Sequence, residues 1–163
     1  MTEFAVPTAG SGPTDIAPAS DGNLWFTEYL GNKIGRITPG GSITEFALPT
    51  PNSGPFGITA GPVGSERLYF TQYLGNRVGT ISTVGTVVNA ASLGAGSGPT
   101  GIAVVGGSVW LVANGGNSLI RMVNDATPSV IALGGGLAPF GLTGGPGNTI
   151  WVSMLFANQV WRF

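Results

Sequence analysis

The sequence predicts an all-β protein, a β-propeller to which the chain supplies four four-stranded antiparallel blades. Three observations predict this fold: one tripeptide recurs four times, each copy divides into short β-branched and aromatic runs, and the N-terminal segment repeats an internal segment. The tripeptides are Ser11-Gly12-Pro13, Ser53-Gly54-Pro55, Ser97-Gly98-Pro99 and, more loosely, Leu137-Ala138-Pro139. Their prolines lie 42, 44 and 40 residues apart, and a fixed period of about 20 to 50 residues is typical of repeat architectures.

Each copy is expected to begin with an inner strand directly after its proline, followed by a turn and a second, more apolar strand. Runs of β-branched and aromatic residues bounded by Gly, Pro and Asn are typical of strands, and Gly in the turns accepts a positive φ. The inner strands are expected at residues 14–17, 56–60, 100–104 and 140–143, and the second strands at 24–27, 68–71, 109–112 and 150–153. No apolar spacing of 3.6 residues persists for ten residues, so essentially no helix is expected.

A third strand follows a polar turn in each copy, and a fourth strand closes the first three copies. Ile34 and Ile37 mark the third strand of the first copy, and Val78 and Ile81 mark that of the second. The fourth strands are expected at residues 43–48, 86–91 and 129–133. The chain therefore reads as one domain with repeats at approximately 8–48, 49–91, 92–133 and 134–163 plus 2–6.

The last copy ends after its third strand, and the segment that matches its missing fourth strand lies at the other end of the sequence. Residues 2–7 (Thr-Glu-Phe-Ala-Val-Pro) copy residues 44–49 (Thr-Glu-Phe-Ala-Leu-Pro) almost letter for letter. We therefore expect the N-terminal strand to pair with residues 159–163 and to close the last blade. Four-stranded repeats whose ends share a strand are typical of a β-propeller, which leaves only short, protected edges.

Two assemblies are compatible with this closure. A single chain can form a small four-bladed ring, or two chains can join head to tail as an eight-bladed homodimer in which each N-terminal strand completes the partner's last blade. Small residues in the strands favour thin, closely packed sheets and hence the narrow wedges of the dimer. These residues are Gly35, Gly57, Gly79, Gly101, Gly141, Ala17 and Ala60.

The composition excludes several classes of function. Charged residues make up 8% of the 163 residues, against about 25% in an ordinary domain. The net charge is −1 and the six basic residues form no run, so no nucleic-acid partner is expected. The chain contains no Cys and no His, which removes the thiolate nucleophile, the commonest general base and the commonest transition-metal ligand.

The hydropathy pattern argues against a membrane partner. Residues 78–120 carry no charge, but Gly, Ser, Asn and Pro interrupt this stretch every few residues. It therefore lacks the run of about 20 apolar residues that a membrane span needs. The N-terminus shows no basic and then apolar segment typical of a signal peptide, so we expect a soluble protein, either cytoplasmic or secreted with its signal removed.

Candidate ligand-binding residues lie on the first inner strand, which is expected to face the central channel or its mouth, and at the ends of the second strands. Asp15 stands on the inner strand where the other copies carry glycine, and Glu28 and Gln72 end the second strands of the first two copies. Tyr29 and Tyr73 follow directly. Asp15 and Glu28 offer oxygen ligands suited to Mg²⁺ or Ca²⁺, but no dense acidic spacing supports a metal site. The favoured interpretation is that no cofactor is bound and that Asp15 is hydrogen-bonded to backbone N–H groups.

The aromatic residues of the second strands and the hydroxyl residues are not assigned to a site. Two interpretations are open for the four aromatic residues Trp25, Tyr69, Trp110 and Trp151. They could form a circle of side chains that binds sugars, or they could form the core between blades. Their regular place within the most apolar strands favours the core. Ser and Thr are plentiful, but without His no nucleophile–base pair can be assembled, so no catalytic residue is expected.

Three segments of the first two copies carry a family resemblance. Ser-Gly-Pro-Phe-Gly-Ile-Thr-Ala-Gly-Pro at 53–62, Gly-Asn-Leu-Trp-Phe-Thr-Glu-Tyr at 22–29 and Gly-Asn-Lys-Ile-Gly-Arg-Ile-Thr-Pro at 31–39 closely resemble the blades of streptogramin B lyases, the virginiamycin B lyase family. The resemblance covers the whole chain and is stronger in the first two copies. It implies a seven-bladed enzyme that linearises cyclic depsipeptides by elimination across the lactone ester, with a catalytic histidine and Mg²⁺. This chain has four copies and no histidine.

Two functions follow as alternatives. The favoured one is a non-catalytic, self-assembling propeller scaffold or binding module, which takes a small molecule or peptide at its channel mouth. The other is a Mg²⁺-dependent C–O lyase acting on streptogramin B-type cyclic depsipeptides, in which a carboxylate takes the place of the missing base.

Overall fold

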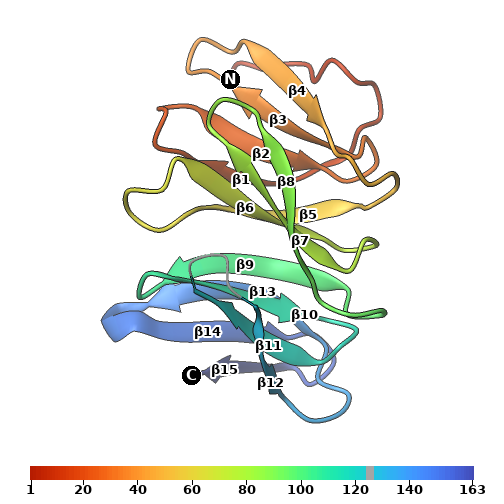
Figure 1. The fold of residues 1–163 in the computed structure, drawn as a ribbon, viewed down its shortest axis with the longest axis vertical. Helices are drawn as coiled ribbons and strands as arrows, with labels where there is room; N and C mark the ends of the chain where they lie inside the picture. The colour runs from red at the N-terminus through yellow and green to blue at the C-terminus, as the bar shows by residue number, and fades with distance from the viewer. Residues whose placement is uncertain (124–126) are drawn as a thin grey trace.

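The computed structural model describes residues 1–123 and 127–163 and contains four antiparallel sheets in chain order (Figure 1). The first sheet comprises β1 (Pro13–Pro18), β2 (Leu24–Glu28), β3 (Lys33–Ile37) and β4 (Ile43–Ala47), and the second comprises β5 (Pro55–Ala60), β6 (Arg67–Gln72), β7 (Arg77–Ser82) and β8 (Val87–Ser92). The third comprises β9 (Pro99–Val105), β10 (Ser108–Ala113), β11 (Ser118–Met122) and β12 (Ser129–Ala132), and the last comprises β13 (Pro139–Gly145), β14 (Thr149–Met154) and β15 (Gln159–Arg162). A single 3-10 turn, Pro146–Asn148, is the only helical element of the described residues. The predicted all-β propeller fold is confirmed.

The sheets are the blades of a propeller arc. Each sheet is an up-and-down meander, and the innermost strands β1, β5, β9 and β13 contact one another in succession. Figure 1 shows the blades stacked in order, with the N-terminus beside the first blade and the C-terminus on the last. Among the described residues, β1 and β13 share no comparable contact, so the chain does not close into a four-bladed ring.

The packing between blades repeats along the chain and defines two faces for each blade. On the side facing the preceding blade, the N-side face, blade two presents Ile58, Phe70 and Ile81. On the side facing the following blade, the C-side face, blade one presents Trp25 and Ile34. All five belong to one buried apolar cluster, and comparable clusters lie at the two other junctions. Stacked sheets bury apolar side chains from both facing surfaces in this way.

Three of the four aromatic residues of the second strands lie at these junctions, as the sequence favoured. Trp25 and Tyr69 are buried, and Trp110 packs against the cluster between blades three and four. Arg36 lies over the Trp25 ring at 5.6 Å, and Arg162 lies over the Trp151 ring at 5.9 Å. Trp151 is 37% exposed because the described chain places no blade after the last one.

The glycines of the third strands make room for aromatic rings. A Cβ atom on Gly35 would overlap the ring of Phe26, and a Cβ atom on Gly79 would overlap the ring of Phe70. Each phenyl ring therefore lies flat on the third strand of its own sheet. The ring of Phe70 is covered by blade one, whereas that of Phe26 lines a pocket on the first blade. This close approach agrees with the thin sheets that the small residues predicted.

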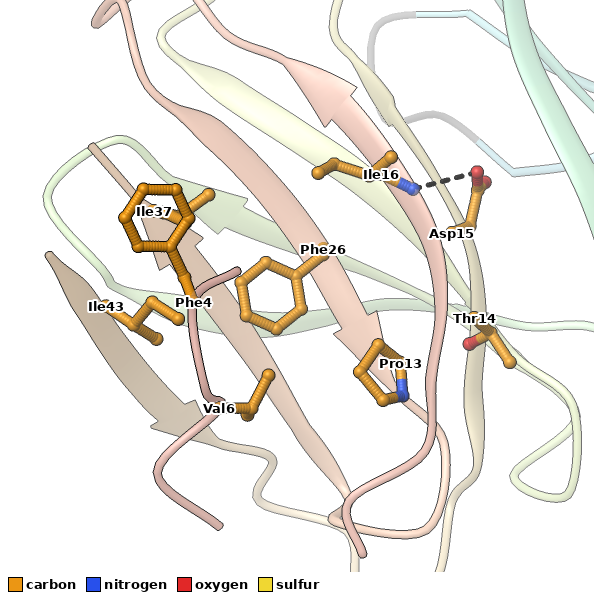
Figure 2. Close-up of a pocket in the computed structure, with 9 residues that line it drawn as sticks. All are labelled: Phe4, Val6, Pro13, Thr14, Asp15, Ile16, Phe26, Ile37 and Ile43. Carbon is orange, nitrogen blue, oxygen red and sulfur yellow. Dashed lines mark hydrogen bonds between the residues drawn. The ribbon is translucent and has the colours of Figure 1, made fainter. Parts of the chain in front are cut away.

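The expected closure of the last blade by the N-terminal strand of the same chain is wrong. The last blade has three strands, with β15 at its edge, and residues 2–6 form no strand among the described residues. They lie instead against the first blade (Figure 2), where Phe4 and Val6 contribute to a pocket with Phe26. The physical reason is that the blades form an open arc, so the far edge of the last blade lies out of reach.

Within residues 1–123 and 127–163, no helix has both the length and the apolar character needed to cross a membrane.

Candidate functional site

The candidate site lies at the edge of the arc where the inner strands begin. Each inner strand starts opposite the end of its second strand: Pro13 pairs with Glu28, and Pro55 pairs with Gln72. The same register holds in blades three and four. Residues that follow either the prolines or the second strands therefore gather at one mouth of the channel.

An aromatic cluster occupies this mouth. The ring of Phe56 lies at its centre, 6.2 Å from the ring of Tyr29, 6.3 Å from that of Tyr73 and 5.6 Å from that of Phe140. Tyr29 and Phe140 meet Phe56 edge to face, an arrangement that aromatic pairs favour. We call these four residues the mouth cluster.

Phe56 and Phe140 were not predicted as site residues. Their signal is the Phe that follows the conspicuous proline in the second and fourth copies, where the first and third copies carry Thr14 and Thr100. Taken alone, a Phe that begins an inner strand is more simply assigned to a core. Only the curvature of the arc brings the two rings, which have one blade between them, within contact of each other.

Threonine hydroxyls between blades fix the backbone of the mouth cluster. Thr27 Oγ1 donates to the carbonyl oxygen of Phe56 at 2.6 Å, and Thr100 Oγ1 donates to that of Phe140 at 2.8 Å. Thr27 and Thr100 are fully buried, so water does not compete for these bonds. The two phenyl groups therefore stand on rigid, interlocked strands.

Glycines that precede the inner strand of the next blade leave room for the rings of Tyr29 and Tyr73. A Cβ atom on Gly54 would lie 2.9 Å from the Tyr29 ring, and a Cβ atom on Gly98 would lie 3.1 Å from the Tyr73 ring. Both glycines also have positive φ, 59° and 49°, which disfavours larger residues. Tyr29 and Tyr73 are half-buried at this position, so each ring keeps one accessible part.

Asp15 lies on the inner strand and joins two blades. Its Oδ1 accepts a hydrogen bond from Ile16 N, and its Oδ2 accepts one from Ile58 N on the second blade, both at 2.9 Å. Both carboxylate oxygens are thus bound to backbone N–H groups, the interpretation that the sequence favoured. This arrangement gives Asp15 a structural role at the junction of β1 and β5.

Glu28 and Gln72 lie in the interior instead of lining the mouth. Both side chains are fully buried, and Gln72 Nε2 donates to Asn89 Oδ1 at 2.9 Å. Glu28 occupies the matching place in blade one, beside Ser11, Gly31 and Glu45. Desolvation by burial, and next the negative charge of Glu45, raise the pKa of Glu28. Glu28 thus takes the position that Gln72 has in the next blade, and its burial there disfavours the charged form.

The described residues do not fit a bound Mg²⁺ ion. Within residues 1–123 and 127–163, no group of three or more His, Cys, Asp or Glu side chains is placed to hold a metal. Asp15 faces backbone N–H groups, while Glu28 faces Ser11 and Glu45, so the two carboxylates have different neighbours. The mouth therefore presents an apolar, aromatic surface.

Comparisons with known proteins agree with this fold. A model of the virginiamycin B lyase family matches residues 1–163. A solved streptogramin B lyase superposes with a TM-score of 0.92 at 31% identity, over 99% of this chain and 54% of that one. A catalytically inactive histidine-to-alanine variant of virginiamycin B lyase from Staphylococcus aureus, solved with quinupristin, superposes with a TM-score of 0.90 at 31% identity, over 99% of this chain and 58% of that one.

The sequence relatives match over shorter segments. The virginiamycin B lyase of Nocardia farcinica is 38% identical over 61 residues, which are 37% of this chain and 22% of the relative. The chain thus spans little more than half the length of the solved lyases.

Proposed function

Because the chain belongs to the virginiamycin B lyase family, we propose that it is a non-catalytic, self-assembling propeller module of lyase-type blades that binds a small molecule or peptide at its mouth. The observation that carries the binding function is the mouth cluster of Tyr29, Phe56, Tyr73 and Phe140. Phe140 is exposed and the other three rings are half-buried. Rigid aromatic side chains of this kind supply contact area at a low cost in conformational entropy.

The chemistry of the mouth favours a ligand with apolar or aromatic groups. Leu30 and Leu74 follow Tyr29 and Tyr73 directly, and both are exposed, which extends the apolar surface beyond the cluster. The one carboxylate on the neighbouring inner strand, Asp15, is hydrogen-bonded to two backbone N–H groups. Quinupristin, which accompanies the inactive S. aureus lyase in its structure, is therefore a suitable probe.

The absence of histidine from this sequence supports a non-catalytic function. The 163 residues contain no histidine, and in the S. aureus relative a histidine-to-alanine variant is described as catalytically inactive. The buried Glu28 lies away from the mouth surface, and the described residues offer no metal cluster. A second candidate, a C–O lyase acting on streptogramin B-type depsipeptides, is favoured by the family match alone.

A titration with quinupristin in the presence of Mg²⁺ separates the two candidates. Calorimetry measures binding, and chromatography detects ring opening, because elimination yields an isomer with unchanged mass. We expect binding with intact antibiotic. Either Phe56→Ala or Phe140→Ala should weaken binding at least tenfold, as expected for loss of about 1.4 kcal/mol of aromatic contact.

Val84→Ser is the matched control, since Val84 is exposed on the β7–β8 loop, at the opposite end of the strands from the mouth. Accumulation of the linear product would establish the lyase instead. No binding up to about 1 mM, the weak end of specific recognition, or equal affinities for the phenylalanine variants and V84S would refute the assignment of the mouth.

A further inference from the structure

The N-side face of the first blade is open, whereas the N-side face of each later blade is covered by the blade before it. A cavity of about 350 Å³ lies on it (Figure 2), with Ile16, Phe26 and Ile37 among its lining. The matching residues of blade two are Ile58, Phe70 and Ile81, which are buried in one cluster with Trp25 and Ile34 of blade one. The cavity thus marks the place where a preceding blade would insert its aromatic and β-branched side chains.

The C-side face of the last blade carries the side chains that fit this place. Trp151 pairs with Arg162 in the register in which Trp25 pairs with Arg36, and Val160 takes the position of Ile34. Trp25 and Ile34 are fully buried, whereas Trp151 is 37% and Val160 66% exposed. The last blade therefore offers the half of a junction that the first blade lacks.

Residues 2–6 already lie where the outer strand of a preceding blade belongs. A Cβ atom on Gly41 would overlap the Phe4 ring, just as one on Gly85 would overlap the ring of Phe46, the outer-strand residue of the blade before it. The N-terminal segment meets blade one as β4 meets blade two. It lacks only the neighbouring third strand.

The polar contacts of the N-terminal segment follow the same repeat. Thr8 N and Oγ1 donate to the carboxylate of Glu45 at 2.9 and 2.8 Å. In the next blade, Thr50 accepts a hydrogen bond from Asn89 Nδ2 at 3.0 Å. Glu45 lies opposite Gly35 as Asn89 lies opposite Gly79, so the two contacts are equivalent.

A hydrogen bond between an asparagine of one blade and a serine of the next recurs along the chain. The two ends of the arc each carry one of the two partners without the other. Asn32 Oδ1 accepts from Ser53 Oγ at 2.8 Å, and Asn76 Oδ1 accepts from Ser97 Oγ at 3.2 Å. The equivalent Ser11 Oγ is buried without a hydrogen-bond partner in the described part of the chain, although Glu28 lies close to it. Asn158, in the matching turn of the last blade, shares the positive φ of Asn32, 52° against 53°, and is exposed.

We infer that a second copy of this chain completes the ring. The C-side face of each copy's last blade packs on the N-side face of the other's first blade, with Trp151 and Val160 entering the cavity. Residues 2–6 pair with the partner copy's β15, and Asn158 accepts a hydrogen bond from Ser11 of the other copy. The occupant is a second copy because one chain carries both halves of a junction that it already forms three times, and two identical junctions close a twofold ring of eight blades.

The register of the shared strand follows from the first blade. Lys33 lies opposite Ala47, and Ile34 lies opposite Phe46. Gln159 of one copy is therefore opposite Ala5 of the other, and Val160 is opposite Phe4. The inference extends the self-assembly in the proposed function and is independent of ligand binding, since all four residues of the mouth cluster lie in one chain.

Solution mass tests the assembly directly. Light scattering after size exclusion should give a particle of about 33 kDa, twice the 16.4 kDa of the chain. Val160→Asp should release a folded 16.4 kDa monomer, because it places a charge in the closing junction. Val130→Asp is the matched control: Val130 is similarly exposed, at 61%, on the edge strand β12, and this variant should remain at about 33 kDa.

Disulfide trapping tests the register without relying on a destabilised variant. The chain has no cysteine, so Ala5→Cys in one preparation and Gln159→Cys in another, mixed and oxidised, should yield covalent pairs. Ala5→Cys mixed with Ser129→Cys, which lies on exposed β12, should not. A wild-type monomer, an open-ended series of larger particles, equal behaviour of V160D and V130D, or no cross-link between the first two chains would each overturn the inference.

Failure of the assembly leaves the quinupristin titration unaffected as a test of the mouth cluster. Conversely, loss of quinupristin binding in Phe56→Ala with an unchanged particle mass would confirm the mouth and leave the dimer in place.

Discussion

The ring of Phe4 packs directly against Gly41, which lies in the turn between β3 and β4 and has a φ of 88°. This contact holds the N-terminal segment on the first blade, together with the hydrogen bonds from Thr8 to Glu45. It gives an outer-strand segment a fixed position although no neighbouring strand of the same chain pairs with it.

Gly41→Ala should therefore destabilise the protein by about 2 kcal/mol, because a methyl group both strains a positive-φ position and displaces the Phe4 ring. Gly40→Ala is the control, since a Cβ atom there would have as its nearest neighbour Thr38 Oγ1, 3.8 Å away. Urea unfolding measures both free energies. Equal losses in the two variants would show that Phe4 does not depend on Gly41.

Glu28→Gln should stabilise the protein at neutral pH. Desolvation first, and then the Glu45 charge, raise the pKa of Glu28 above 4.5 in the folded state, so the unfolded state ionises first. The stability contributed by the protonated carboxyl is complete below pH 4.5 and declines as the pH rises through the raised pKa. Unfolding free energies measured from pH 4 to pH 8 should fall in the wild type and stay flatter in E28Q. A steeper decline in E28Q would contradict this account.

Glu45 should give the opposite dependence on pH. Desolvation opposes ionisation, but hydrogen bonds from Lys33 and Thr8 outweigh it and lower the pKa of Glu45 to about 2. The stability that Glu45 contributes is therefore present above pH 4.5 and is lost as the pH falls toward 2. Glu45→Gln should cost about 1 kcal/mol at pH 7, the upper end of the range for surface ion pairs, because the side chains of Lys33 and Glu45 are only 28% and 12% exposed.

The control for Glu45→Gln is Glu66→Gln, because Glu66 is exposed. The difference between E45Q and the wild type should vanish near pH 2. A difference that persists undiminished at that pH would rule out the Lys33–Glu45 pair as its source.

Asn32→Gly should cost about 2 to 3 kcal/mol. Its side chain donates to Thr50 O at 2.9 Å and accepts from Ser53 N and Oγ at 2.7 and 2.8 Å, and Ser53 is fully buried. Removing the side chain leaves buried polar groups unpaired, while glycine keeps the positive φ without strain. Thermal and urea unfolding measure the loss.

Asn52→Gly is the matched control for Asn32→Gly, since Asn52 has a φ of 51° and an exposed side chain. It should change the free energy of unfolding by only a few tenths of a kcal/mol. A loss in N52G as large as that in N32G would assign the effect to the backbone conformation instead of the contact between blades.

Local patterns were sufficient for the blades themselves. Alternation of β-branched and aromatic residues between glycines, prolines and asparagines depends on neighbours only a few positions away. For this reason strands such as β2 and β6 lie where the sequence placed them, and Trp25 and Tyr69 lie in the core between blades.

Repeat position alone was not sufficient for Glu28. The sequence placed it at the end of a strand, and hence near the mouth, but the side chain is buried beside Ser11 and Glu45. Which way a side chain points at a strand end depends on the loop that covers it, and this loop comes from a different part of the chain. Phe56 and Phe140 lie together for a similar reason, since their contact spans one intervening blade.

The sequence by itself determined the repeating unit, the order of its strands, the close packing at Gly35 and Gly79, and the likeness between residues 2–7 and 44–49. Only the tertiary structure decided where that N-terminal copy lies. A strand's own residues specify which face becomes buried, but the partner edge depends on how far the blades curve around the axis, a sum of small rotations at each junction. In this chain the four blades leave an open arc, so Phe4 lies on the first blade while β15 remains an unpaired edge at the other end.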